Sequence, residues 1–98
     1  MSAKASYRLS PLAEADLEDI WLYTYRTWSL EQAEAYQASI VAAFEGLAAN
    51  RKTGRPVDIR EGYLKYAVGS HLIFYRRGDL GVDVIRILHQ QMDAQRHL

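Results

Sequence analysis

The strongest constraint on the fold is a pair of helix-start signals in the first third of the chain. They predict two helices that only a very short linker connects. Ser10-Pro11 is typical of an N-cap followed by proline at the first helical position, and it predicts a helix over residues 11–28. Ser29 with Gln32 three residues later forms a capping box, which predicts a second helix ending near Asn50. Because almost no linker separates them, the two helices are expected to form an antiparallel hairpin.

Each expected helix carries an apolar stripe at the helical period and therefore has one face to bury. The stripe of the first helix comprises Ala13, Leu17, Ile20, Trp21, Thr24 and Trp28, and that of the second comprises Ala33, Tyr36, Ile40, Phe44 and Leu47. Both stripes must be buried against another element. The rest of the chain is predicted to form strands, and the sheet that they build can cover both stripes.

Strand-like runs lie on both sides of the helical hairpin. Residues 5–9 alternate in polarity, and three further runs occupy residues 63–69, 71–77 and 82–89. Residues 50–62 form a basic stretch rich in turn-forming residues. The order β-α-α-β-β-β predicts an α+β fold, with the hairpin packed on one face of a small, mainly antiparallel sheet and a short C-terminal helical turn.

Several classes of protein are disfavoured by what the sequence lacks. The 98 residues suit a single domain, residues 1–98, and contain no cysteine for a disulfide or a thiolate metal site. The three histidines have no metal-ligand spacing, and no catalytic serine motif or phosphate-binding glycine loop is present. No secretion signal or apolar run near the roughly 20 residues of a membrane span is visible. We therefore expect a cytoplasmic protein without a metal, a cofactor or a membrane partner.

Charge is divided unevenly along a chain whose net charge is zero. Residues 1–49 hold three bases and seven acids, whereas residues 50–98 hold nine bases and five acids. Either the halves neutralise each other in the fold, or one half meets an anionic partner. Arg86 lies within an apolar strand, so it is expected either to pair with an acid such as Asp83 or Asp93 or to line an exposed sheet face.

Three segments together resemble the ParE branch of the RelE/ParE toxin superfamily, over nearly the whole chain. They are the strand leading into Ser10-Pro11, the stretch RPVDIREGYLKYAVGSHLIFYR and the ending VIRILHQQMDAQRHL. The resemblance implies a bacterial type II toxin of the plasmid-stabilisation kind, which inhibits DNA gyrase, stabilises its cleaved-DNA complex and arrests growth. It also implies a ParD-type antitoxin that binds the toxin directly, in a heterotetramer or a larger complex. No sequence-specific DNA binding by this chain alone is expected.

The RelE branch of the same superfamily implies a different activity, because its members cut mRNA on the ribosome. Such cleavage needs groups that transfer protons and cations that stabilise the phosphorane. Cations are available in the C-terminal half as Arg60, Lys65, Arg76 and Arg86. The tyrosine that the RelE branch carries near its C-terminus is absent here, and residues 88–98 offer only His89 and His97.

The sequence is therefore interpreted as a gyrase-inhibiting toxin that is not an enzyme. Two alternatives stay open: a RelE-type ribosome-dependent endoribonuclease, and a non-toxic member that only binds its antitoxin and regulates its operon.

Gyrase contacts are expected at the end of the last strand and in the tail that follows it. The candidates are Arg86, His89, Met92, Asp93, Arg96 and Leu98. Met92 and Leu98 are predicted to be apolar anchors, and Asp93 with Arg96 to tie the final turn to the sheet. The structural alternative is that His89 only bonds the backbone and the tail only covers the sheet edge.

Antitoxin contacts are expected on the first helix, on the side opposite its buried stripe. Leu22 lies there, with Tyr23 and Tyr25 beside it. An amphipathic antitoxin segment laid on the hairpin, and continuing as an added strand at the sheet edge, would bury these side chains.

Overall fold

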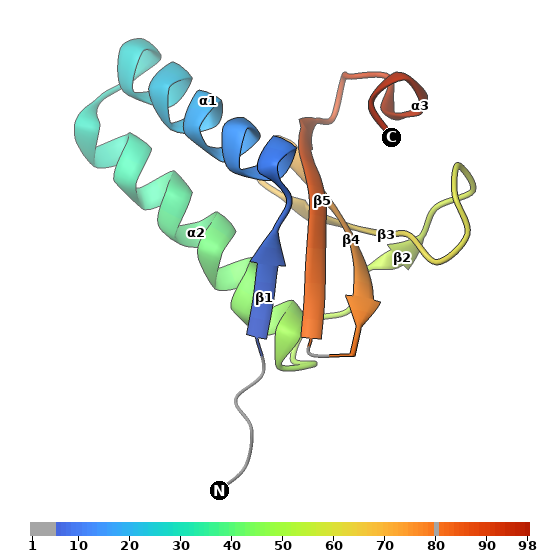
Figure 1. Ribbon diagram of the computed structural model, residues 1–98. Helices are drawn as coiled ribbons and strands as arrows, with labels where there is room; N and C mark the ends of the chain where they lie inside the picture. The colour runs from blue at the N-terminus through green and yellow to red at the C-terminus, as the bar shows by residue number, and fades with distance from the viewer. Residues whose placement is uncertain (1–5, 80) are drawn as a thin grey trace, which may run out of the picture.

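The computed structural model describes residues 6–79 and 81–98. Its elements in chain order are β1 (Ser6–Leu9), α1 (Pro11–Thr27), α2 (Leu30–Ala48), β2 (Arg55–Pro56), β3 (Leu64–Val68), β4 (His71–Gly78), β5 (Gly81–His89) and α3 (Ala94–His97). The two long helices run antiparallel on one side of the sheet, and α3 lies beyond the end of β5 (Figure 1). The predicted α+β architecture is confirmed; residue 5 of the predicted first strand lies outside the described residues.

The sheet is mixed and five-stranded, in the order β1-β5-β4-β3-β2. β1 pairs with β5 in parallel, and the other neighbours pair antiparallel, as expected for a mainly antiparallel sheet. β2 occupies two residues of the stretch that was predicted only to turn. A two-residue strand is too short to show the alternation by which strands are recognised in sequence.

Both helices begin at the predicted caps. The Ser10 hydroxyl accepts a hydrogen bond from the Ala13 N–H at 3.0 Å, and the Ser29 hydroxyl accepts one from the Gln32 N–H at 3.1 Å. α1 ends at Thr27, so the two residues before Leu30 form the whole connection. Both N-caps, and the hairpin they predict, are thus confirmed.

The core lies between the hairpin and one face of the sheet. Its buried members from the hairpin are Ala13, Ile40, Ala43, Phe44, Leu47 and Ala48, and those from the sheet are Ile73, Tyr75, Val82, Val84 and Ile87. Ile40, Phe44 and Leu47 of the predicted α2 stripe belong to this cluster, Ala33 is buried, and the half-buried Tyr36 packs against the cluster. The prediction for Trp28 is wrong: this residue is 73% exposed, because it follows the end of α1 and its backbone leaves the helical conformation.

The short length of β1 leaves one side of β5 without a neighbouring strand beyond Val84, where the pairing of β1 with β5 ends. Side chains of the α1 region take over the exposed backbone groups. The Ser10 hydroxyl donates to the carbonyl oxygen of Ile85 at 2.7 Å, and the Asp16 carboxylate accepts from the N–H of Ile87 at 3.0 Å. These bonds fix the position of α1 along β5.

None of the helices in the described parts of the chain is both long and apolar enough to cross a membrane.

Candidate functional site

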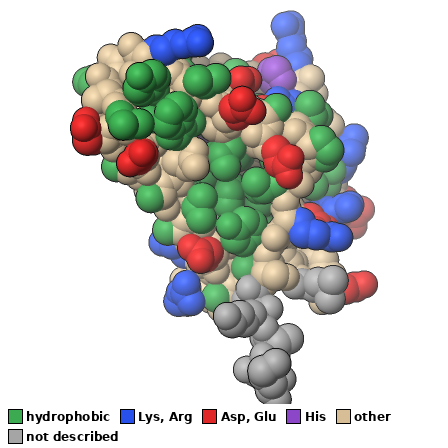
Figure 2. Space-filling model, turned by 60° about the vertical axis from the view of Figure 1, so that its left-hand side comes forward, with side chains coloured by type: hydrophobic (Ala, Val, Ile, Leu, Met, Phe, Trp, Pro, Cys, Tyr) green, Lys and Arg blue, Asp and Glu red, His purple; other side chains and the backbone are tan. Residues whose placement is uncertain are grey.

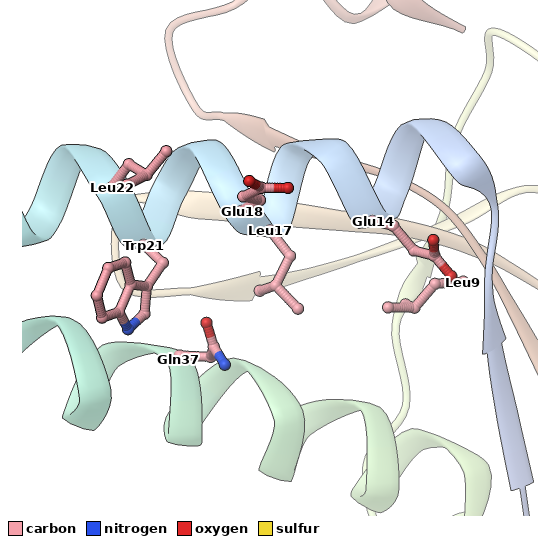
Figure 3. A pocket seen from close by; sticks show the side chains of 7 residues that line it. All are labelled: Leu9, Glu14, Leu17, Glu18, Trp21, Leu22 and Gln37. Carbon is pink, nitrogen blue, oxygen red and sulfur yellow. The ribbon is translucent and has the colours of Figure 1, made fainter.

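An open groove runs along the hairpin, between α1, α2 and the end of β1. Its volume is about 450 Å³, and its lining consists of Leu9, Glu14, Leu17, Glu18, Trp21, Leu22 and Gln37. Figure 3 shows Leu17 and Trp21 extending from α1 toward α2, with Gln37 approaching from the facing helix. On the surface seen in Figure 2, apolar side chains gather on this side of the molecule with carboxylates around them.

The groove exists because the core does not cover the whole stripe of α1. Ala13 is fully buried, whereas Leu17 and Trp21 are only half-buried. Trp21 also stacks on Tyr25, with ring centroids 5.3 Å apart and planes inclined by 13°. An apolar floor with carboxylates at its rim suits the apolar face of an amphipathic segment that carries basic side chains at its margin.

The three residues predicted to contact an antitoxin do not form one patch. Leu22 is half-buried and lines the groove rather than standing alone on the surface. Tyr25, at 48% exposure, extends the groove through its stack on Trp21. Tyr23 lines a different hollow of about 320 Å³. The sequence reasoning missed the groove itself, because it assigned Leu17 and Trp21 to the buried stripe.

That second hollow lies where the hairpin connection meets the β3–β4 turn. Its lining comprises Tyr23, Thr24, Trp28, Gln32, Tyr36, Ser70, His71 and His89. The rings of His71 and His89 meet edge to face, with centroids 5.3 Å apart. The pKa of His71 is lowered by its burial and by the nearby His89, while Asp16 acts in the opposite direction.

Tyr36 fixes His71 and the adjoining turn. Its hydroxyl lies 2.7 Å from Nδ1 of His71, accepts from the Ser70 N–H at 3.0 Å and lies 3.1 Å from the carbonyl oxygen of Val68. Gly69 has a positive φ of 55°, and a Cβ there would lie 2.6 Å from the Tyr36 ring. Glycine therefore permits both the turn and the close approach of Tyr36.

His89 lies in the hollow beside the hairpin and is also bonded to the start of the tail. It shares the hollow with His71, directly opposite it in the β4–β5 register. Its Nδ1 accepts a hydrogen bond from the N–H of Gln91 at 3.1 Å, which is the backbone-bonded role considered for it in the sequence.

Arg86 is paired, but the predicted partners are wrong. Its Nε and Nη2 donate to the two carboxylate oxygens of Asp16 at 2.7 and 2.8 Å. The side chains of this pair are only 15% and 14% exposed. The hydrogen bond to Asp16, opposed by burial, raises the pKa of Arg86. Asp83 instead binds Arg8 at 3.0 Å. Asp16 was missed because α1 comes beside β5 only in the folded chain.

The tail is attached to the sheet by contacts other than those predicted. Asp93 caps α3, accepting from the Gln95 N–H at 3.1 Å, and lies 3.6 Å from Arg96. These two side chains bind each other instead of the sheet, because both belong to one short helical turn. The tail is held by Gln90, whose Nε2 donates to the carbonyl oxygen of Gly69 at 3.0 Å, and by a 3.4 Å bond from Arg86 to the carbonyl oxygen of His97.

The two predicted apolar anchors of the tail differ in exposure. Met92 is 50% exposed, whereas Leu98 is half-buried. Only Met92 therefore presents a large apolar side chain to a partner.

The basic residues of the sheet are separated from the histidines. Lys65 is opposite Phe74, one position out of phase with the core residue Ile73, so Lys65 and Arg76 are on the face away from the hairpin. Arg60 lies over the Tyr63 ring, 5.4 Å from its centroid. The sheet thus stands between Lys65 and Arg76 on one side and the two histidines on the other. Arg60 lies outside the strands and donates a 3.4 Å hydrogen bond to the Tyr63 hydroxyl. Within residues 6–79 and 81–98, no three metal-ligating side chains come together.

Comparison with known proteins gives matches over most of the chain. Residues 7–94 match the family described as "ParE toxin of type II toxin-antitoxin system, parDE". The chain is 49% identical over 94 residues to "Toxin ParE1" of Mycobacterium tuberculosis, and 46% identical over 93 residues to "Toxin ParE1" of Caulobacter vibrioides. Each alignment covers 94% of this chain and 96% of the relative.

Solved structures show the same fold at lower sequence identity. A chain of the "Chromosomal ParDE TA system from P. aeruginosa" superposes with a TM-score of 0.76, and one of the toxin–antitoxin complex RelBE2 from Mycobacterium tuberculosis with 0.62. Both are 23% identical to this chain and cover 90% of it, matching 98% and 100% of their own lengths.

Proposed function

Because the chain belongs to the ParE toxin family of type II toxin–antitoxin systems, we propose that it arrests bacterial growth by inhibiting DNA gyrase in the cytoplasm. A ParD-type antitoxin neutralises it by direct binding, in a heterotetramer or a larger complex. The observation that carries the proposal is the family match across residues 7–94, joined to a surface that offers binding features rather than an assembled catalytic centre.

The geometry favours inhibition by binding over RNA cleavage. A cleavage site needs proton-transfer groups and cations within reach of one phosphate. Here Lys65 and Arg76 lie on one face of the sheet, His71 and His89 lie on the other, and Asp16 neutralises Arg86. A protein that traps an intermediate of another enzyme needs only a surface that binds this intermediate better than other states.

The hairpin groove is the proposed antitoxin site. Leu17, Trp21 and Leu22 provide an apolar floor that no other described part of the chain covers, and Glu14 and Glu18 favour basic side chains at its rim. An amphipathic antitoxin helix would bury this floor. The similar solved structures include toxin–antitoxin complexes, in agreement with a partner of this kind.

The tail is the proposed gyrase-binding element. Met92, Asp93 and Arg96 are exposed on it, and the cap and ion pair that Asp93 forms stay within the tail itself. His89 and Arg86 contribute indirectly, by positioning the tail. His89 accepts from the N–H of Gln91, and Arg86 donates to the carbonyl oxygen of His97.

A paired assay on the purified protein tests the proposal. One arm incubates it with gyrase, ATP and plasmid, and the expected result is lost supercoiling with protein-linked linear DNA, reversed by the cognate antitoxin. The other arm incubates it with translating ribosomes, where mRNA should stay intact. Cut mRNA with unaffected gyrase would establish the ribonuclease alternative. No effect in either arm, with antitoxin binding intact, would leave the chain as a non-toxic regulatory member.

A further inference from the structure

The face of the sheet turned away from the hairpin carries basic side chains in cross-strand register. Arg55 on β2 is directly opposite Lys65 on β3, and residues directly opposite each other share one face of a sheet. Arg76 follows two residues after Phe74, the partner of Lys65 on β4, so it shares this face as a diagonal neighbour. Arg8 reaches the same face through its pairing with Asp83.

The positive charges on this face are not all neutralised by acidic residues of the described chain. Asp83 is the acid that Arg8 and Arg76 share, at 3.0 and 3.7 Å. For Arg55 and Lys65, both exposed, the described residues provide no ion-pair partner. Like charges directly opposite each other destabilise a strand pair. An external anion would remove this repulsion.

The surface around Arg55 and Lys65 is hollowed. A depression of about 400 Å³ is lined by Thr53, Gly54, Arg55, Lys65, Tyr66, Ala67 and Leu72. Gly54 donates to the Tyr75 hydroxyl at 2.8 Å, and a Cβ on it would lie 2.5 Å from the carbonyl oxygen of Lys65. This close approach holds the segment before Arg55 against β3, so Thr53, Arg55 and Lys65, which carry a hydroxyl, a guanidinium and an ammonium group, line one hollow. Such a set of donors suits a phosphate group.

We infer that this sheet face binds the phosphate backbone of duplex DNA, through Arg55 and Lys65 with Arg8 and Arg76 beside them. Proteins that bind single-stranded nucleic acid commonly stack its bases on exposed aromatic rings. On this face Phe74 is 1% exposed and Tyr63 is 9% exposed, so neither ring is free to stack. Tyr66, the ring that lines the hollow, is half-buried and packs against the core. Contacts to phosphates alone carry no sequence preference. The inference extends the proposed function, since gyrase acts on duplex DNA, but the binding itself requires no gyrase.

The test measures binding of the intact protein to a short fluorescently labelled DNA duplex by anisotropy, over a series of salt concentrations. Lys65→Glu should weaken binding about fivefold or more and reduce the slope of log K against log salt by roughly 1. Arg55→Glu should act alike. Arg26→Glu on α1 makes the same change of charge at an exposed site outside this face and should leave the affinity within about twofold. Circular dichroism should show each variant to be folded.

The inference would be overturned by no binding of the duplex by the wild-type protein at low salt, or by equal losses in Lys65→Glu and Arg26→Glu. Tighter binding of single-stranded RNA than of the duplex at equal salt would also overturn it. DNA binding that depends on Lys65 without gyrase inhibition would refute the proposed function alone. Gyrase inhibition with DNA binding insensitive to Lys65 would refute only this inference.

Discussion

At the residue scale, Asp16 is the side chain on which the packing of α1 against β5 depends most. Its carboxylate accepts from two guanidinium nitrogens of Arg86 and from the N–H of Ile87. The sequence indicates that Arg86 needs a partner, because a charge within an apolar strand is unfavourable alone. It cannot indicate which acid, since Asp16 lies 70 positions away along the chain.

Replacing Asp16 with alanine should lower the free energy of unfolding by roughly 2–4 kcal/mol, because Arg86 would lose its partner in a site little exposed to water. Urea denaturation followed by circular dichroism measures the change. The matched control is Asp19→Ala, which removes an exposed carboxylate from the same helix and should change the stability by less than about 1 kcal/mol. Equal effects at the two positions would show that the Arg86 contact contributes little.

The two facing histidines give a prediction about pH. Burial and His89 lower the pKa of His71 in the folded chain. As the pH falls through the pKa of the unfolded chain, about 6.5, the unfolded chain therefore binds more protons than the folded chain. Stability should therefore be fully present above that value and fall as the pH approaches the folded pKa.

In an NMR titration, His89→Gln should move the pKa of His71 upward, whereas His97→Gln should leave it unchanged. An unaltered titration in His89→Gln would contradict the proposed coupling.

At the scale of elements, periodicity and capping predict the helices well because both are local properties. The two serine caps lie within three residues of the helix N–H groups that they accept from. Periodicity says which stripe is apolar, but not how much of it the sheet will cover. The apolar stripe therefore predicted Leu17 and Trp21 to be core residues, whereas in the packed structure they line a groove.

The groove gives a prediction for α1. Leu22→Asp should weaken antitoxin binding at least about tenfold, because a carboxylate would be buried among apolar groups and beside Glu18. Isothermal titration calorimetry measures the affinity. Leu12→Asp makes the same substitution on the same helix, at a residue 58% exposed and outside the groove, and should leave the affinity unchanged. If both variants bind the antitoxin like the wild type, the antitoxin lies elsewhere.

The tail gives a separate prediction. Deletion of residues 92–98 should abolish gyrase inhibition and growth arrest while antitoxin binding survives, because the groove lies on the hairpin rather than on the tail. Met92→Ser serves as a milder variant that keeps α3 and should reduce inhibition in the same direction. Plasmid supercoiling assays measure both. A folded truncated protein that inhibits gyrase as well as the full chain would exclude the tail as the binding element.

At the scale of the whole molecule, charge and topology were predictable to different extents. The uneven charge of the two halves becomes a spatial separation, with carboxylates around the hairpin groove and unpaired bases on the far face of the sheet. Element order was readable from the sequence, but the parallel pairing of β1 with β5 was not. It joins residues 75 positions apart, and nothing local in either strand specifies it.

The shared core predicts cooperative unfolding. Both tryptophans lie in the hairpin region, whereas far-ultraviolet circular dichroism reports helices and strands together. Because the buried cluster draws on α1, α2, β4 and β5 at once, tryptophan fluorescence and circular dichroism should give coincident urea transitions. Separate midpoints would show that the hairpin unfolds independently of the sheet.

The strand order also affects how the chain folds during its synthesis. β5 lies between β1 and β4 in the sheet, yet both strands are translated before it. β1 must therefore wait for residues 81–89 to leave the ribosome before it can pair. Until then the nascent hairpin, already made, keeps its apolar stripes uncovered. During that interval a chaperone can bind the chain. The groove and the two faces of the sheet form only after β5 has paired with β1 and β4.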